Sequence, residues 1–133
     1  MPIDIAIVML GTNDLQAALG LFPEAVTIAI SRCVKAIRRS DRLVGTAEPK
    51  VLVICPPSLK EIGFRSVTYG GATAKSQALP PLLRQMALSL GADFLDAGQH
   101  ASVSDVDGIH LEPDQHHSLA RAVTTALGSS SGH

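Results

Sequence analysis

The chain has 133 residues, enough for one domain around a single core, and 46% of them are hydrophobic while 17% are charged. This balance is that of a globular protein and excludes a disordered chain. The formal net charge of -1, with both signs scattered along the sequence, shows no basic footprint for nucleic acid or for a membrane surface.

The first predicted element is a strand at residues 3–10, where Ile-Asp-Ile-Ala-Ile-Val-Met-Leu is almost continuously apolar. Such a run is typical of a strand covered on both faces, and it is far too short to cross a bilayer. A helix is predicted at residues 23–39, with Pro23 in its first turn. Its apolar face carries Val26, Ile30, Cys33 and Ile37.

The next elements repeat the alternation of strand and helix. Residues 50–55 predict a second strand that stops at Pro56. Residues 72–90 predict a helix with an apolar stripe, in which Pro80 and Pro81 should produce a kink or mark the true start. A weaker strand at 92–96 and a helix at 113–127 complete the pattern.

Two longer loops are expected, at residues 40–49 and 56–71. The second loop holds Phe64 and Tyr69, two of the four aromatic residues, and could form a lid over a pocket. The final six residues, 128–133, resemble an added linker followed by the start of a tag, so the expected domain is 1–127.

Alternating strands and helices predict an α/β domain with a parallel sheet and right-handed connections. The two cysteines, Cys33 and Cys55, lack the spacing of a metal or redox motif, and we expect both to be buried thiols. Free thiols and no signal peptide fit a cytoplasmic setting without a membrane partner.

Two motifs lie beyond the carboxyl ends of predicted strands. Gly11-Thr12-Asn13-Asp14 follows the first strand, and Asp107-Gly108-Ile109-His110 lies between the third strand and the last helix. Open parallel sheets place their ligands at this edge. An Asn amide held at the end of a rigid strand can donate to a developing oxyanion, and Gly11 would allow the turn that aims Asn13.

The second motif suits general-base chemistry. An Asp three residues before a His can accept the imidazole N–H and fix its tautomer, so that His110 could take a proton from a hydroxyl. Each motif alone also fits a plain turn: the first with an Asn or Asp helix cap, the second with a solvated His. Their joint occurrence in this order favours the catalytic interpretation.

A metal site is a weaker alternative for the second motif. Asp107, His110, Asp114, His116 and His117 could form a ligand cluster, but their spacing matches no strong zinc pattern. We expect His116 and His117 to be exposed helix residues, and we expect no metal or other cofactor.

The residues around both motifs resemble the SGNH (GDSL-type) serine hydrolases. Residues 4–14 (DIAIVMLGTND) resemble that family's third block, and residues 106–116 (VDGIHLEPDQH) its fifth block. The segments KVLVICPP and ADFLDAG and the pair Gly70-Gly71 are similar to the arylesterase and acyltransferase branch. The resemblance implies a flavodoxin-like α/β/α fold, of which this chain would hold the carboxyl-terminal three β-α units.

The resemblance also implies roles for individual residues. Asn13 would be an oxyanion donor, with Gly11 as the motif glycine, Asp107 would orient the imidazole and His110 would be the base. The substrates implied are small carboxylic esters, with hydrolysis or acyl transfer as the reaction.

The family's nucleophile block, a strand followed by Gly-Asp-Ser, does not occur in the sequence, nor does the second block. Ser58 and Ser104 are the nearest hydroxyls by location, although both are expected to be loop residues, and Cys55 is a poorer candidate. We therefore expect little or no activity from this chain alone. The serine would lie on another chain, in an upstream segment, or nowhere.

Two further expectations follow. The alternative to an esterase is an inactive fragment or binding module that keeps the scaffold, and a metal-dependent hydrolase ranks third. Removing the first two strands of the family's sheet would leave residues 3–10 at an edge. We therefore expect this strand to pair with a second copy, in a homo-oligomer, or with a complementing amino-terminal segment.

Overall fold

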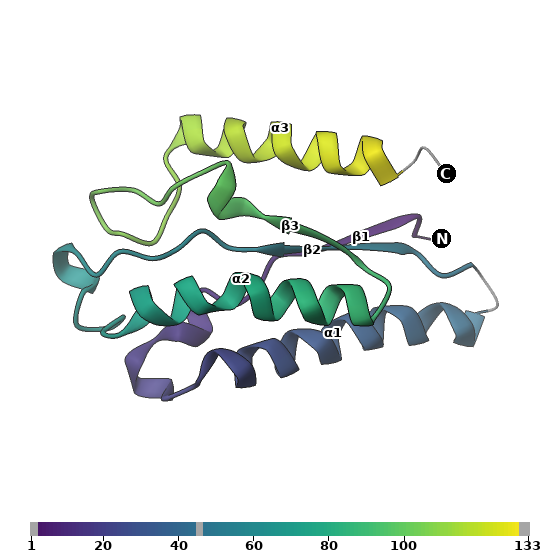
Figure 1. The fold of residues 1–133 in the computed structure, drawn as a ribbon, viewed down its shortest axis with the longest axis horizontal. Helices are drawn as coiled ribbons and strands as arrows, with labels where there is room; N and C mark the ends of the chain where they lie inside the picture. The colour runs from purple at the N-terminus through teal and green to yellow at the C-terminus, as the bar shows by residue number, and fades with distance from the viewer. Residues whose placement is uncertain (1–2, 45–46, 131–133) are drawn as a thin grey trace.

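The computed structural model describes residues 3–44 and 47–130. In that part of the chain, three strands form one parallel sheet in the order β1-β2-β3: β1 (Ile5–Val8), β2 (Lys50–Cys55) and β3 (Asp93–Asp96). The long helices are α1 (Pro23–Val44), α2 (Ala72–Ser89) and α3 (Pro113–Ser130). Figure 1 shows α1 and α2 on one face of the sheet and α3 on the other. The predicted three-layer α/β/α architecture is therefore confirmed.

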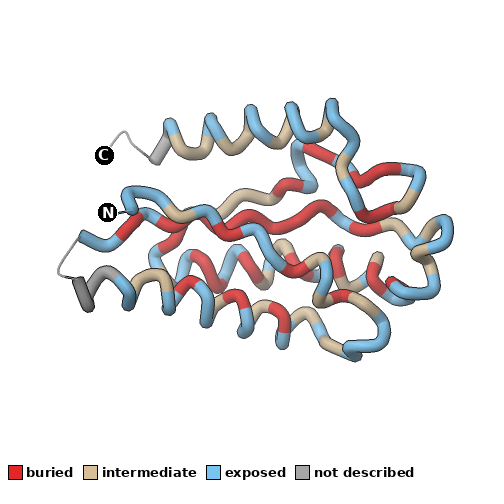
Figure 2. Tube along the Cα trace, turned by 180° about the vertical axis from the view of Figure 1, so that it is seen from behind, coloured by how far each residue is buried: buried red, intermediate tan, exposed pale blue. Residues whose placement is uncertain are grey.

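The central strand β2 joins the two halves of the core. Val51, Val53 and Cys55 pack toward α1 and α2, whereas Leu52 and Ile54 pack toward α3. Figure 2 shows this strand buried along most of its length. A strand covered on both faces has to be apolar at every position, which is why its sequence does not alternate.

Strand β1 is only half covered. Val8 is buried against the helices, but Ile5 and Ile7, whose side chains point to the opposite face of the sheet, are exposed. The register places Ile7 beside Leu52, so these exposed side chains lie on the α3 face of the sheet. Because β1 pairs only with β2 among the described strands, its other edge carries no partner.

Helix α1 differs from its prediction in two ways. It continues to Val44, so the loop expected to begin at residue 40 starts later. Its inner face carries Val26, Ile30 and Val34, and Cys33 is exposed, so the predicted burial of that thiol is wrong. Successive residues of a helix lie 100° apart, and Val34 is the better continuation of the row through Val26 and Ile30.

Helix α2 runs through Pro80 and Pro81, so of the two expected outcomes, a kink or a helix start at these prolines, the start is wrong. Each proline lacks an N–H and typically costs a helix interior about 3 kcal/mol. Leu79 and Leu83 are almost completely buried, and burying one such side chain stabilises the fold by about 1.5–3 kcal/mol. Together with the other buried apolar residues of the helix, Ala72, Met86 and Ala87, this packing offsets the local penalty.

Helix α3 extends past its predicted end. It passes through Gly128 and ends at Ser130, so that glycine does not terminate the helix. The rest of the expected linker, residues 131–133, lies outside the described residues. None of the helices in residues 3–44 and 47–130 has the length and apolar character needed to span a membrane.

Candidate active site

Both motifs lie at the same end of the sheet. The strands are parallel, and the Asn13 turn follows β1 while the Asp107 loop follows β3. Figure 1 shows the two connections at the end where the strand arrows point. This is the edge at which open α/β sheets bind their ligands.

The first motif forms a tight turn rather than a cap on a long helix. Asn13–Leu15 is a 3₁₀ helix, η1, and its first turn is closed by a hydrogen bond of 3.2 Å from the Asp14 N–H to the Gly11 carbonyl. Gly11 has a φ of 125°, a conformation that residues with a β-carbon rarely adopt. The turn leaves Asn13 exposed beyond the end of the strand.

The second motif forms a carboxylate–imidazole pair. His110 Nδ1 lies 2.5 Å from Asp107 Oδ2, while Asp107 Oδ1 accepts the backbone N–H groups of Ile109 and His110 at 2.8 and 3.0 Å. The Asp107 side chain is 16% exposed and that of His110 is 66% exposed. With Nδ1 donating to Asp107, the lone pair of Nε2 is the free basic site of the neutral ring.

Hydrogen bonds stabilise the negative charge of the Asp107 carboxylate. The hydrogen bond with the His110 ring, followed by those from the backbone N–H groups of His110 and Ile109, holds the pKa of the Asp107 carboxyl well below its usual range. An ionised Asp107 orients the imidazole and stabilises the imidazolium that forms when the ring takes a proton. This arrangement is therefore chemically able to accept a proton at Nε2 of His110.

Ser104 holds this loop together. It is 6% exposed, and its backbone N–H donates to the His110 carbonyl while its own carbonyl accepts from Gly108. Its hydroxyl donates to Glu112 at 2.6 Å and accepts from the Val106 N–H at 3.0 Å. A hydroxyl that makes both of these hydrogen bonds stabilises the loop, so the geometry does not favour Ser104 as a nucleophile.

Gly108 shows how closely the loop packs on the segment after β2. Its φ is 73°, and a β-carbon there would lie 2.0 Å from the Lys60 carbonyl oxygen. Its carbonyl accepts the Lys60 N–H at 3.0 Å. The Lys60 ammonium adds a hydrogen bond to the Asp105 carboxylate at 2.5 Å. The glycine is thus required both for its backbone conformation and for space.

A small pocket of about 230 Å³ opens beside the first motif. It is lined by Met9, Leu10, Gly11, Thr12, Asn13, Asp14 and Pro56. The pocket brings the Asn13 turn together with Pro56, the residue that follows β2, and His110 is not part of its lining. The structure thus gathers the oxyanion candidate and the Asp–His pair at one end of the sheet, in separate loops.

Solved structures similar to this chain include three bacterial proteins. The chain is 30% identical to a carbohydrate acetylesterase from Sinorhizobium meliloti, with a TM-score of 0.91, and 32% identical to the aryl esterase of M. smegmatis, with a TM-score of 0.89. A protein from Agrobacterium tumefaciens is 35% identical, with a TM-score of 0.87. Each match covers 97% of this chain and 62% of the other. No protein-family model and no curated protein matches the sequence.

Matches at 30–35% identity over nearly the whole chain, with the same fold, support the resemblance that the two motifs carry. The chain has the fold of SGNH hydrolases. It spans 62% of the length of these three structures. The similarity alone therefore does not transfer the activity, substrates or partners of a whole SGNH hydrolase to it.

The other candidate nucleophiles of this chain are poorly suited. Burial raises the pKa of the Cys55 thiol to about 12, and the nearby Asp96 carboxylate acts in the same direction. A thiol so far from ionisation is unreactive. Ser58 is exposed in the loop after β2, and no described contact pairs its hydroxyl with His110.

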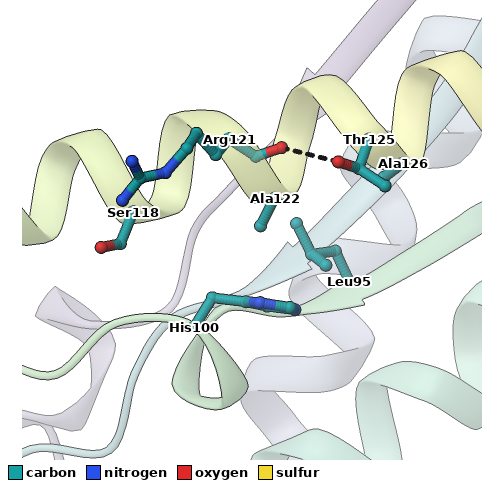
Figure 3. A pocket seen from close by; sticks show the side chains of 7 residues that line it. All are labelled: Leu95, His100, Ser118, Arg121, Ala122, Thr125 and Ala126. Carbon is teal, nitrogen blue, oxygen red and sulfur yellow. Dashed lines mark hydrogen bonds between the residues drawn. The ribbon is translucent and has the colours of Figure 1, made fainter.

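The remaining sequence candidates lie away from the motifs. His116 and His117 are exposed on α3, as predicted. Within residues 3–44 and 47–130, no three His, Cys, Asp or Glu side chains are grouped to hold a metal ion. A groove of about 490 Å³ between α3 and β3 contains His100 and Arg121 (Figure 3), but neither motif contributes to it.

Two parts of this site are not evident from the sequence. The sequence presents Ser104 only as a nearby hydroxyl, whereas in the structure its hydrogen bonds organise the Asp107 loop. Tyr69 was considered only as part of a lid, although it is buried and its hydroxyl lies 3.2 Å from Asn13 Oδ1. The one signal for Tyr69 is its rarity, since it is the only tyrosine in the chain.

Proposed function

We propose that this chain is the oxyanion and general-base part of an SGNH-type serine esterase acting on small carboxylic esters. Asn13 would donate to the oxyanion, Asp107 would orient the imidazole, and His110 would accept the proton of a serine hydroxyl supplied by another polypeptide segment. The observation that carries the proposal is the Asp107–His110 pair, because its 2.5 Å hydrogen bond leaves Nε2 free at the sheet end that bears Asn13.

The chemistry divides into two steps. His110 Nε2 takes the serine proton as the oxygen attacks the ester carbonyl, the carbonyl oxygen becomes an oxyanion beside the Asn13 amide, and the protonated imidazole then gives its proton to the leaving alcohol. In the second step His110 takes a proton from water as the water oxygen attacks the acyl carbon, the acyl–serine bond breaks, and the imidazolium returns the proton to the serine oxygen. An alcohol has the same kind of O–H as water, so we include acyl transfer to alcohols in the proposal.

The test compares the chain alone with the chain complemented by a separate polypeptide that carries a strand followed by Gly-Asp-Ser. Hydrolysis of 4-nitrophenyl acetate is measured for each. The chain alone is expected to stay near the uncatalysed rate and the complemented assembly to turn over. In that assembly, Asn13→Ala should lower kcat by about 10²–10³, as for one oxyanion donor. His110→Ala should nearly abolish turnover, as loss of a triad member costs about 10⁴–10⁶ in a comparable hydrolase.

Control variants separate the proposal from its alternatives. His116→Ala and Ser58→Ala leave the proposed site intact and should keep full activity. Robust turnover by the chain alone that survives both Ser58→Ala and Ser104→Ala would reveal another nucleophile and overturn the assignment. A complemented assembly that melts cooperatively yet hydrolyses no ester would favour a binding module. Adding benzyl alcohol and measuring benzyl acetate reports acyl transfer.

A further inference from the structure

The orientation of the Asn13 amide decides whether it can act as a donor. A carboxamide carries an acceptor oxygen on one side and a donor NH₂ group on the other, and rotation about χ2 exchanges them. Only the NH₂ group can stabilise an oxyanion. Asn13 is exposed, and within the part of the chain that the structure describes its side-chain amide has one hydrogen bond, with Tyr69, so the turn itself does not hold the amide in one orientation.

Tyr69 supplies the missing restraint. Its hydroxyl lies 3.2 Å from Asn13 Oδ1, although 56 residues separate the two in sequence. Among the described residues, Asn13 is the hydrogen-bond partner of the Tyr69 hydroxyl. The residue is only 3% exposed, and a buried O–H group without an acceptor is costly. The arrangement in which Tyr69 donates to Oδ1 is therefore favoured, and it turns Nδ2 away from the tyrosine.

The tyrosine is itself well anchored. Its side chain belongs to the core between the sheet and helices α1 and α2. Its N–H donates to the Arg65 carbonyl at 3.0 Å, and its carbonyl accepts from Ala72 at 2.9 Å, at the start of α2. A rigid donor can select one orientation of a mobile amide, whereas an exposed tyrosine could not.

A second contact ties the same two segments together. The Ala17 N–H, just after η1, donates to the Thr68 carbonyl at 2.8 Å. The backbone bond at Thr68 fixes the distance between the segments, and the side-chain bond at Tyr69 fixes the amide. Asn13 lines the pocket of about 230 Å³ beside this contact.

We infer that Tyr69 is a positioning residue for the oxyanion site. Its hydroxyl donates a hydrogen bond to Asn13 Oδ1, and this bond holds the Asn13 NH₂ group in the orientation that is available to a substrate oxygen. This inference rests on the proposed function of Asn13. It gives the segment after β2 a structural role, because the tyrosine of that segment packs in the core and also contacts Asn13.

The first test uses the chain by itself and needs no activity. Tyr69→Phe keeps the buried ring and removes only the hydroxyl. We expect the order parameter of the Asn13 side-chain amide, measured by ¹⁵N relaxation, to fall below about 0.6, the range of flexible groups. Phe64→Leu is the matched control, since Phe64 is an aromatic residue of the same segment that is 77% exposed, and it should leave the Asn13 amide unchanged. An unchanged Asn13 amide in a folded Tyr69→Phe variant would overturn the inference.

The second test uses the ester-hydrolysing assembly. Tyr69→Phe should lower kcat about tenfold, the effect of one hydrogen bond, with KM nearly unchanged. In the Asn13→Ala background the same substitution should have no further effect, because the group it positions is gone. An equal loss in both backgrounds would show a merely structural role and contradict the inference. Absence of turnover in the unsubstituted assembly would count against the proposed function alone, since the amide measurement still reports on Tyr69.

Discussion

Asp107 uses its two carboxylate oxygens for different tasks. Oδ1 accepts two backbone N–H groups and so holds the loop in shape, while Oδ2 receives the imidazole of His110. Both tasks favour the ionised carboxylate over the protonated acid. The loop geometry and the basicity of the site are therefore coupled through one charge.

This coupling predicts a pH dependence. Because the pKa of Asp107 is lowered in the folded chain, its ionisation stabilises the fold at pH values above the ordinary carboxyl pKa of about 3.9, and that stabilisation is lost as the pH falls through the lower folded value. The carboxyl ¹³C shift of Asp107 should stay that of an ionised group from pH 7 down to about 3.

The same dependence should appear in unfolding experiments. The stability difference between the wild-type chain and Asp107→Asn should be largest near neutral pH and shrink in acid. Asp4→Asn, which removes an exposed carboxylate far from this loop, is the control for the lost charge. A carboxyl of Asp107 that titrates near pH 4 would contradict the role given to these hydrogen bonds.

The Asp–His pair could be predicted from the sequence because its members are three residues apart in a glycine-containing turn, so local geometry decides their contact. The bond between Tyr69 and Asn13 could not be predicted in this way. It joins residues 56 apart in the chain, and it depends on how the segment after β2 packs, which no local pattern encodes.

At the scale of elements, periodicity locates helices better than it locates their ends. The apolar rows of α1 and α2 were visible in the sequence, but α1 continues to Val44 and α2 passes through two prolines. Helix ends depend on capping and on tertiary contacts, and burial of Leu79 and Leu83 decides the outcome in α2. The prediction placed Cys33 in the buried row of α1. The buried row instead runs through the neighbouring residue, Val34, and Cys33 is exposed.

The two cysteines therefore predict a labelling experiment. Cys33 is exposed on α1, whereas Cys55 is buried at the end of β2 with its pKa raised to about 12, so that roughly 10⁻⁴ of it is thiolate at pH 8. A thiol reagent at that pH should modify one cysteine quickly and the second only after unfolding in guanidinium. Cys33→Ser should remove the fast phase. Two fast equivalents in the native chain would show that β2 is not held in a closed core.

At the scale of the molecule, the central strand β2 is covered on both faces, whereas β1 has an exposed face and a free edge. The fold class could be predicted because each β-α unit carries its own pattern and right-handed connections leave few arrangements. The position of residues 3–10 at an edge of the sheet is what the resemblance to the SGNH hydrolases implies. The degree to which β1 is covered depends on what lies beyond its free edge. Its α3 face exposes the apolar side chains of Ile3, Ile5, Ile7 and Met9, which lie two residues apart.

We therefore expect this chain to associate through β1. An edge strand offers unpaired N–H and C=O groups, and the adjacent apolar stripe has no charge within it to oppose pairing. A second copy would pair with β1 antiparallel across a two-fold axis, placing the two Asn13 turns at opposite ends of a continuous sheet. A separate amino-terminal segment would compete for the same edge, so adding it should convert the homo-oligomer into a complex with one copy of each chain.

Sedimentation velocity at micromolar concentration measures this directly. The wild-type chain should sediment as a dimer or larger species, and the Ile5→Lys, Ile7→Lys variant should shift toward the monomer because two like charges would then face their copies across the pairing edge. Ile28→Lys is the matched control: Ile28 is also an exposed isoleucine, but it lies on α1, so its substitution should leave association unchanged. A wild-type monomer that melts cooperatively, and in which the β1 N–H groups on the edge away from β2 exchange rapidly with solvent, would show that this edge needs no partner, since a stable fold with that edge unpaired is the one arrangement that the association hypothesis excludes.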